Sequence, residues 1–495
     1  MSDTNTQATP ALQGKQIFGH PAGLFVLFGA EMWERFCFYG MRTLLVLYMV
    51  QGFLTYDDPK AYGVYGSYNS LVYLTPILGG LLADKLLGYS KAIMLGAVFM
   101  AIGEFSLLVQ NQMFFYAGMA MLIVGNGFFK PNISTIVGKL YPDGDPRRDG
   151  GFSIFYMGIN IGAFLSTTIC GYIGERFGWH YGFGLAGLGM LLGLVIFSAG
   201  GNLLQGQGEA KDPAKSRKYF PLVILGSLAA VPVITLLLQN HKAVEWLLII
   251  AAVSVFGYLM IAAFREDVVQ RHKMWVIIIL AFFHMIFWSF FEQAGSSLTL
   301  FTERNVDRMM FGWEFPTTWG QSFNPIFIVI FGPVFAALWV FLSKRRMNPS
   351  IPNKFTLGLL QVGLGFAVLV LASKVLSAAG LVPLWTLVFC YLLHTTGELC
   401  LSPVGLSMVT KLAPARMTGL VMGAWFLSIA GAHSVAAFIA RLTGGAGGDG
   451  EAVDAVAGLG IYSGVFFDIF KAAMVAVVVL FALSPILKKW LHGVE

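Results

Sequence analysis

Four ionisable side chains, Glu31, Glu34, Arg35 and Arg42, lie within the first long apolar segment, residues 23–50. The segment is long enough to cross a bilayer as a helix. A charge inside a bilayer costs several kcal/mol, so it needs a partner or a function. At about 100° per residue the four side chains share one face, and Glu31 and Arg35 form an i, i+4 pair. We expect this face to relay protons or bind substrate; a structural ion pair that orients the helix is the alternative.

A lysine from another segment is expected to reach this cluster. Lys130 lies about seven residues from the inner end of the apolar segment 113–137, which runs opposite to the first segment. At about 1.5 Å per residue, Lys130 and Glu31 lie roughly 10–12 Å above the same membrane face. We therefore expect Lys130 to join Glu31, Glu34 and Arg35 in proton coupling. A lysine that snorkels to the membrane surface is the alternative.

Two charges from opposite halves of the chain are expected to meet near the outer mouth. Counted along their segments, Arg42 and Glu292 both lie roughly 27–29 Å from the inner face. A salt bridge between them would close an outer gate, and protonation of Glu292 would weaken it. Glu398 lies near mid-depth, where it can face a substrate. The intramembrane histidines are expected to be packed residues; they are His284, His394 and His433.

The composition indicates an all-α integral membrane protein. The 495 residues are 57% hydrophobic and 12% charged, whereas a soluble domain carries about 25% charged residues. The four cysteines lie in apolar segments, so we expect free thiols. Fourteen candidate spans are predicted, at approximately 23–50, 62–82, 90–109, 113–137, 152–173, 179–199, 221–239, 243–264, 274–300, 320–343, 355–378, 382–411, 416–441 and 458–487.

The distribution of Lys and Arg predicts the orientation. With fourteen spans, the connections on the side of both termini hold about three times as many Lys and Arg as the other side, which the positive-inside rule assigns to the cytoplasm. The polar N-terminus lacks the pattern of a cleaved signal peptide. The net charge of +6 therefore fits membrane topology, and no nucleic-acid partner is expected.

The spans divide as six, two and six. We expect a cytoplasmic N-terminal tail at 1–22, a six-helix bundle at 23–199, a cytoplasmic linker at 200–219, two extra helices at 220–264 and a second six-helix bundle at 265–490. Two six-helix halves are typical of a transporter that rocks around a central site. The polar intramembrane residues fall in the two bundles, whereas the extra pair has almost none.

Several motifs resemble those of known transporters. The loop that contains Gly79 to Gly88 resembles the signature of the major facilitator superfamily. The stretch Glu31-Met-Trp-Glu-Arg-Phe-Cys-Phe-Tyr-Gly40 resembles the Glu-x-x-Glu-Arg-Phe-x-Tyr-Tyr-Gly pattern of the proton-coupled oligopeptide transporter (POT/PTR) family, bacterial type. Further stretches that resemble this family are Phe128-Phe-Lys-Pro-Asn132, Phe152–Phe164, Trp288–Gln293, Asn324-Pro325, Gly397–Pro403 and Trp425-Phe426.

Two positions depart from the family pattern. Phe38 stands where the first of two tyrosines is usual, so one hydroxyl contact to substrate is expected to be lost. Gly66 stands where animal members carry a histidine. Proton coupling is therefore expected to depend on Glu31, Glu34 and Glu292.

The resemblance implies a major facilitator fold and a proton-coupled symporter that imports di- and tripeptides by alternating access. A zwitterionic peptide needs cations for its carboxylate, a carboxylate for its ammonium group and amides for its backbone. We assign these roles to Arg42 and Lys130, to Glu398, and to Asn160 with Asn324. Aromatic side chains that could form tolerant walls, or simply pack, are Tyr39, Tyr68, Trp288 and Trp425.

The expected setting is the bacterial inner membrane, with lipid around a functional monomer, protons as the coupling ion, and no cofactor or metal. The alternative within transporters is a relative that carries another small anion, a drug or a peptide-like substrate. An intramembrane enzyme is disfavoured because no His-Glu-x-x-His or Gly-x-Ser-x-Gly motif occurs. A channel is disfavoured because paired charges lie on opposite halves.

Overall fold

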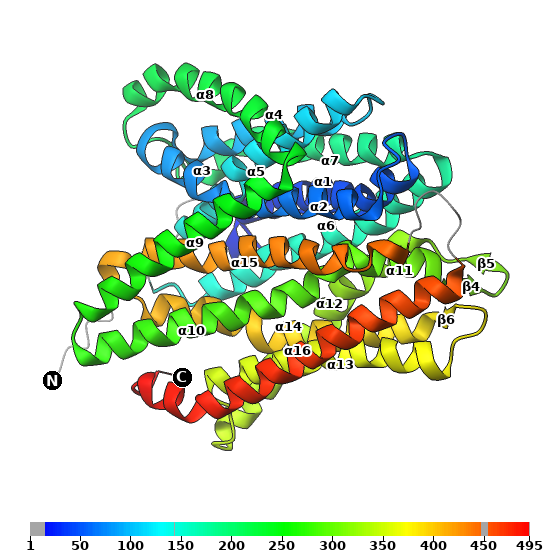
Figure 1. Cartoon of the computed structure of the whole chain (residues 1–495). Coiled ribbons are helices and arrows are strands. Elements are labelled where there is room, and N and C mark those ends of the chain that lie inside the picture. The colour runs from blue at the N-terminus through cyan, green and yellow to red at the C-terminus, as the bar shows by residue number, and fades with distance from the viewer. Residues whose placement is uncertain (1–14, 143, 447–453, 495) are drawn as a thin grey trace.

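The computed structural model describes residues 15–142, 144–446 and 454–494, and most of them lie in long helices that run side by side (Figure 1). Both described ends of the chain lie at one end of the bundle, here called the terminus side. The short strands within residues 306–314 lie at the opposite end, the loop side. Of the predicted tail, residues 1–14 lie outside the described residues, and the remainder includes a small antiparallel hairpin.

The first part of the chain is helical after that hairpin, with one π-helix, η1, and one 3₁₀ helix, η2, among the α-helices. The π-helix η1 follows α3 directly, and Thr75 separates α2 from α3. The elements are β1 (Gln16–Ile17), β2 (His20–Pro21), α1 (Ala22–Gln51), α2 (Asp58–Leu74), α3 (Pro76–Leu82), η1 (Ala83–Leu87), α4 (Tyr89–Ser106), α5 (Gln112–Lys139), α6 (Arg148–Phe177), α7 (Trp179–Ala199) and η2 (Gly201–Leu204).

Two long helices then lead into the last part of the chain. These elements are α8 (Pro213–Gln239), α9 (His241–Phe264), α10 (Val268–Phe291), η3 (Glu292–Gly295), α11 (Ser297–Asn305), β3 (Val306–Asp307), β4 (Met309–Met310), β5 (Trp313–Glu314), η4 (Thr317–Ser322), α12 (Phe323–Lys344), α13 (Ile351–Val375), β6 (Val382–Pro383), α14 (Leu384–Leu412), η5 (Ala415–Met417), α15 (Thr418–Arg441), η6 (Gly444–Ala446) and α16 (Ala455–Trp490).

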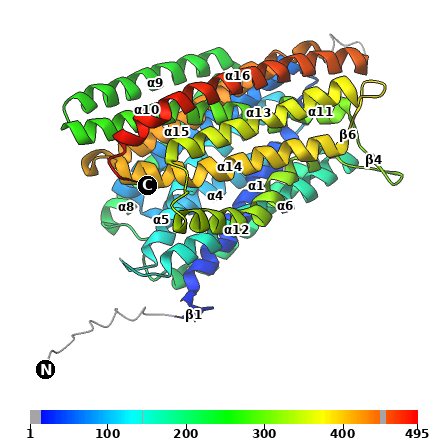
Figure 2. The ribbon, with the colours of Figure 1, turned by 90° about the horizontal axis from the view of Figure 1, so that it is seen from below.

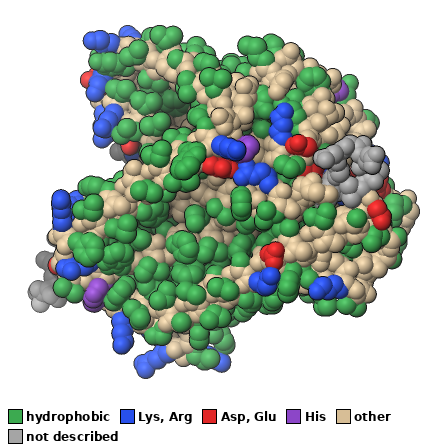
Figure 3. All heavy atoms as spheres, viewed as in Figure 1, with side chains coloured by type: hydrophobic (Ala, Val, Ile, Leu, Met, Phe, Trp, Pro, Cys, Tyr) green, Lys and Arg blue, Asp and Glu red, His purple; other side chains and the backbone are tan. Residues whose placement is uncertain are grey.

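The fourteen predicted spans are present as helical segments. Twelve segments of the described chain are long and apolar enough to cross a membrane, and α1 and α4 are the other two predicted spans. Figure 3 shows apolar side chains over the middle of one face, with many Lys and Arg near the terminus side. Within the predicted span 274–300 the α-helix is interrupted at Glu292, a feature that was not predicted from the sequence.

Polar residues at helix starts fix several boundaries. The first backbone N–H groups of a helix lack partners within it, and an Asp or Asn side chain can accept a hydrogen bond from one of them. Such a cap precedes six of the helices, and the capping residues are Asp57, Asn111, Asp212, Asn240, Asp267 and Asp454.

Small residues bring the helices close together, as is usual in membranes. A Cβ atom at Gly79 of α3 would collide with the carbonyl oxygen of Gly127 in α5, so the two backbones touch there. Within the halves, α1 packs on α6 and α7, and α13 packs on α14 and α16; α2 and α15 join the halves. In Figure 2, α8 lies beside α5, and α9 lies beside α10.

Candidate functional site

The charges of α1 form a buried ion-pair cluster. Nε of Arg35 lies 3.1 Å from Oε1 of Glu31 and also donates to Oε2 of Glu34. Nδ2 of Asn126, on α5, donates to the other Glu34 oxygen at 3.1 Å. Glu31, Glu34 and Arg35 are all buried. The i, i+4 spacing and the shared helix face therefore give the predicted contact between Glu31 and Arg35.

Lys130 lies beside this cluster without forming an ion pair in it. Its Nζ is 4.2 Å from the centre of the Tyr73 ring, a cation–π contact. Glu31 and Glu34 are within electrostatic range of the ammonium group. Lys130 is only half-buried, so it can reach both the carboxylates and a solute. The structure thus brings Lys130 to the predicted depth but places an aromatic ring against it.

Arg42 and Glu292 form an ion pair between the two halves. Nη2 of Arg42 contacts Oε2 of Glu292, while its Nε donates to the hydroxyl of Tyr65 at 2.7 Å. Nδ1 of His433 lies 3.9 Å from the same Glu292 oxygen. His433 is buried, and neither ring nitrogen has a hydrogen-bond partner among the described residues. We predicted a packed histidine, and the structure places this one beside a site carboxylate.

A break in the helix positions Glu292. The α-helix α10 ends at Phe291, and the 3₁₀ turn η3 covers Glu292 to Gly295 before α11 begins. Discontinuous helices at such depths are a recurring way to build binding sites in transporters. The carboxylate of Glu292 therefore lies at the junction between α10 and η3 and not within a continuous α-helix.

Glu398 lies in a second polar group, formed by the second half. Nδ2 of Asn324 is 2.9 Å from Oε2 of Glu398 and 3.1 Å from Oγ1 of Thr395. From the first half, Asn160 donates to the carbonyl of Tyr156 at 3.0 Å, and Tyr156 is within electrostatic range of Glu398. Residues predicted to bind a substrate thus come together from both halves.

The predicted aromatic walls divide into two groups. Tyr39 and Trp288 are half-buried and keep accessible surface. Tyr68 and Trp425 are each only 1% exposed, so in this structure they present almost no surface to a solute. Of the two alternatives, packing describes both residues in this structure. Trp425 packs on the ring of His284, and Nε2 of His284 accepts a 2.9 Å hydrogen bond from Nε1 of Trp288. Trp425 therefore stabilises the position of Trp288 through His284.

Polar contacts between the halves gather on the loop side. The bidentate pair of Arg304 with Asp58, at 2.6 and 2.9 Å, joins α11 to the start of α2. Other contacts are Gln51 Nε2 to Glu303 Oε1 at 3.2 Å, the backbone N–H of Thr317 and of Thr318 to Glu175 at 3.0 and 2.7 Å, and Thr167 Oγ1 with Ser322 Oγ at 2.6 Å. These contacts connect the two halves on the loop side.

Several residues of the site were not predicted from the sequence. Tyr65 and Asn126 are neutral polar residues within predicted spans. Only a spacing of three or four residues from a predicted site residue on the same helix could have identified them. Asp58 and Arg304 lie in connections between the predicted spans, where no site residue was expected. Among the described residues, no group of His, Cys, Asp and Glu gathers in a way that could hold a metal ion. The arrangement can hold and release protons and can bind both charges of a zwitterion.

Comparison with known proteins gives consistent matches. Residues 90–452 match the family described as "PTR2: POT family". The peptide transporter YePEPT of Yersinia enterocolitica is 40% identical over 460 residues, covering 87% of this chain and 89% of the relative. Dipeptide and tripeptide permease A of Edwardsiella piscicida is 33% identical over 497 residues, covering 100% of both chains. A peptide transporter POT mutant solved in complex with alafosfalin has a TM-score of 0.84 at 37% identity, covering 97% of each chain.

Proposed function

This chain belongs to the POT family, with a major facilitator fold of two six-helix bundles and two extra helices, and from this premise we propose that it is a proton-coupled symporter of di- and tripeptides. The contact that carries the proposal is the ion pair between Arg42 and Glu292, which joins the halves. Protonation of Glu292 removes its charge, and a peptide carboxylate can then take its place on Arg42. Proton and peptide would thus act on the same ion pair.

The proposed peptide site lies between the two polar groups. Arg42 and Lys130 receive the carboxylate, Glu398 receives the ammonium group, and Asn160 and Asn324 contact the backbone amides. Tyr39 lies within electrostatic range of Arg42 and Glu398, so its ring can form a wall between the two ends of a peptide. Backbone and termini, which all peptides share, are then recognised more strictly than side chains. Trp288 forms a second tolerant wall.

The proposed proton path uses the cluster on α1 as well as Glu292. Glu31 and Glu34 compete for Arg35, and Lys130 lies beside them with its ammonium group against the Tyr73 ring. A proton on either carboxylate frees part of the positive charge of Arg35 and Lys130 to bind an anion. The ligand and the proton shift the conformational equilibrium only because each binds the two states differently.

We propose alternating access by movement of the bundles 23–199 and 265–490. In this arrangement the loop side faces the periplasm and is closed, and the linker 200–219 and both termini are cytoplasmic. The excess of Lys and Arg in the connections on the terminus side supports this orientation. The proposed setting is the bacterial inner membrane, as a functional monomer that uses protons without a cofactor and is a carrier, not an enzyme.

Uptake by proteoliposomes tests the function. Protein reconstituted in lipid vesicles is given a labelled dipeptide with an imposed pH gradient, acid outside. We expect saturable accumulation above the external concentration, which collapses when a protonophore removes the gradient. Uptake of an anion or a drug, but not of any dipeptide, would favour the alternative of a family relative with another substrate. Non-saturable equilibration under all gradients would contradict coupled transport.

A further inference from the structure

His433, on α15, is a buried polar side chain whose ring makes no hydrogen bond. It is only 1% exposed, and neither ring nitrogen has a hydrogen-bond partner among the described residues. Buried polar groups are normally paired, because an unpaired one destabilises the conformation that contains it. The ring of His433 therefore lacks a partner in this conformation, and a change of protonation nearby can supply one.

A carboxylate lies just beyond hydrogen-bond distance of this ring. Nδ1 of His433 is 3.9 Å from Oε2 of Glu292, the same oxygen that pairs with Arg42. A hydrogen bond needs about 2.7–3.2 Å between heavy atoms, so the carboxyl group has to approach by about 1 Å. Protonation of Glu292 weakens its attraction to Arg42, which leaves the carboxyl group free to turn toward His433.

The other neighbours of His433 continue toward the terminus side. Its ring packs on the ring of Tyr73, on α2, with 5.0 Å between the ring centres, and Nζ of Lys130 lies 4.2 Å from the centre of the same Tyr73 ring. Counted from the loop-side ends of their helices at about 1.5 Å per residue, His433, Tyr73 and Lys130 lie roughly 12, 22 and 27 Å deep. The three side chains thus form a row that leads from Glu292 toward the ion-pair cluster of α1.

The charges around His433 come from three other elements. Among the described residues, the charged groups within electrostatic range of the ring are Glu292 of η3, Arg42 of α1 and Lys130 of α5. The titratable group from α2 is the phenol of Tyr73. In the described part of the chain, α9, α10 and α14, which also pack on α15, add no charged group to these. An imidazolium is attracted by Glu292 and repelled by Arg42 and Lys130, so it suits a brief stay of the proton and not a permanent one.

We propose that His433 takes the proton from Glu292 and passes it toward the terminus side, a role that rests on the proposed function. The O–H bond of the Glu292 carboxyl group breaks, an N–H bond forms at Nδ1 of His433, and the electron pair of the broken bond stays on the carboxylate. The imidazolium then gives the hydrogen on Nε2 to a water molecule that enters when the terminus side opens. The ring is neutral again, and exchange with water returns the hydrogen from Nδ1 to Nε2.

This transfer sets the order of events at Arg42. While the proton is on Glu292, Arg42 is free to hold the peptide carboxylate. Once the proton is on His433, the charge of Glu292 returns and competes with the peptide for Arg42. The peptide is thus released after the proton has moved on. A carrier without the histidine still binds proton and peptide and exchanges them, but it completes a net transport cycle slowly.

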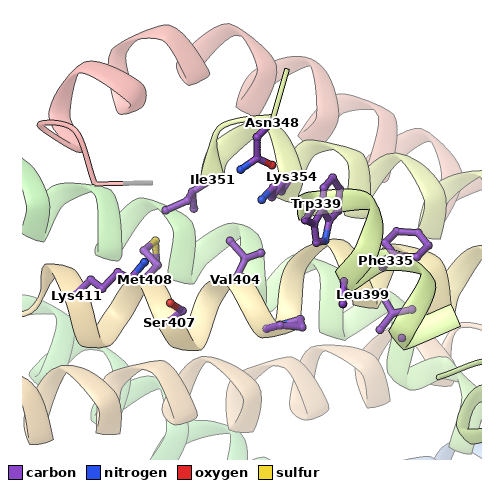
Figure 4. Close-up of a pocket in the computed structure, with 13 residues that line it drawn as sticks. Phe335, Trp339, Asn348, Ile351, Lys354, Leu399, Val404, Ser407, Met408 and Lys411 are labelled. Atoms are coloured by element: carbon purple, nitrogen blue, oxygen red, sulfur yellow. The ribbon is translucent and has the colours of Figure 1, made fainter. Parts of the chain in front are cut away.

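A pocket of about 360 Å³ between α12, α13 and α14 lies outside this path (Figure 4). Leu399 lines it, whereas its neighbour in sequence, Glu398, turns toward Asn324. The row that begins at His433 contributes no side chain to this pocket. Ser407 lines the pocket from α14, so Ser407→Ala changes a polar residue of the second half away from the proton path.

Proteoliposomes that contain His433→Asn test the relay. Counterflow of a labelled dipeptide at equal pH should stay near the wild-type rate, because the loaded carrier crosses without losing its proton. Accumulation driven by an acid-outside gradient should fall by about tenfold or more, since a positioned proton-transfer group typically contributes at least about 100-fold to its step. The internal pH at which uptake is half-maximal should rise, because Glu292 then has to release its proton directly.

The matched control is His394→Gln. His394 is also a buried histidine of the second half, but its Nε2 already contacts Sγ of Cys390 at 3.5 Å. This variant and Ser407→Ala should accumulate peptide as wild type does. Equal accumulation and an equal pH profile in wild type and His433→Asn would overturn the relay and leave the proposed function standing. Absence of accumulation by wild type would contradict the proposed function, and the relay with it.

A second variant separates proton transfer from packing. His433→Phe keeps an aromatic ring against Tyr73 but cannot bind a proton, and it should show the same retained counterflow and lost accumulation. If His433→Asn does not elute as a folded protein, this variant decides the question. Loss of counterflow together with accumulation in the folded variants would show that the ring is needed for packing alone, and would overturn the relay.

Discussion

Arg304 donates to both carboxylate oxygens of Asp58, at 2.6 and 2.9 Å, and so ties α11 to the first turn of α2 on the loop side. Two charge-assisted hydrogen bonds contribute about 1.5–3 kcal/mol to the state that contains them. We predict that Asp58→Asn shifts the protein toward a loop-side-open state by about tenfold or more. Spin-label distances between Cys at Phe53 and Trp385 would measure this shift. Glu245→Asn, which breaks an ion pair with Arg441 within the described residues, is the control and should leave the distances unchanged.

A second prediction concerns the deeper ion pair. Because Glu292→Gln removes the charge that holds Arg42, it should populate the loop-side-open state even at high pH. Peptide binding should also lose its pH dependence, since the proton acts by the same neutralisation. The same spin-label pair, read at high and low pH, checks both statements. If the distances in Glu292→Gln still shift with pH as in wild type, the gating proton binds elsewhere, and the cluster of Glu31 and Glu34 becomes the better candidate.

The α1 cluster should couple the gradient to transport. Glu34 is hydrogen-bonded to Asn126 and paired with Arg35, and Lys130 lies beside the group. We predict that Glu34→Gln or Lys130→Ala abolishes proton-driven accumulation but retains peptide exchange at equal pH. Counterflow of labelled dipeptide in proteoliposomes separates the two activities. Lys374→Ala, in the second bundle, is a control that should accumulate peptide normally. Full accumulation by either cluster variant would refute this role.

Glu398 should recognise the peptide ammonium group. Acetylating the amine of a dipeptide removes its charge, which should weaken competition in wild type by about 1.5–3 kcal/mol, or roughly 10- to 150-fold. In Glu398→Gln the same acetylation should cost much less, because the charged partner is already absent. Competition curves measured with the free and the acetylated dipeptide, in wild type and in Glu398→Gln, give the effect of acetylation on binding in each protein. An equal loss in both proteins would show that Glu398 does not contact that end.

A pH prediction applies to the loop that holds the N-terminal hairpin. Arg147 donates to Asp145 from Nε at 3.0 Å and Nη2 at 2.8 Å, which holds the pKa of Asp145 below its usual value of 3.8. Arg147 also donates to the carbonyl of Gly19 at 3.0 Å. A lowered folded-state pKa means that this stabilisation is present above the unfolded pKa and is lost as pH falls through the folded value.

Hydrogen exchange of the backbone amides of residues 16–21 tests this direction of the pH dependence. We expect their protection to stay constant from about pH 8 to 5 and to fall below about pH 4, after correction for the intrinsic exchange rate. Asp145→Asn should show the low protection at every pH. Asp149→Asn, one turn later, is a control because its carboxylate does not pair with Arg147. A protection profile in Asp145→Asn that matches wild type would contradict the proposed link.

The depth of a residue along its membrane span was predictable from the sequence because the rise of a helix per residue is nearly constant. That rule placed Arg42 opposite Glu292, and the structure contains this ion pair. The rotation of each helix about its axis is set by neighbours that no single segment encodes. Tyr68 and Trp425 therefore turned out buried, and the contact of Asn126 with Glu34 was missed. The interruption at Glu292 was also missed, although the polar, glycine-containing stretch Glu292–Ser297 breaks the apolar pattern there.

The position of Glu292 also has an electrical consequence. The 24 residues of α10 precede it and the 9 residues of α11 follow it, so about 36 Å of helix lies on one side and about 14 Å on the other. In the proposed orientation, a proton arriving from the periplasm crosses only a small part of the membrane potential, which is worth about 2.3 kcal/mol per charge per 100 mV in full. Most of the voltage then acts on the later departure of that proton toward the cytoplasm. Membrane potential should therefore accelerate the return of the carrier more than the loading of its outer site.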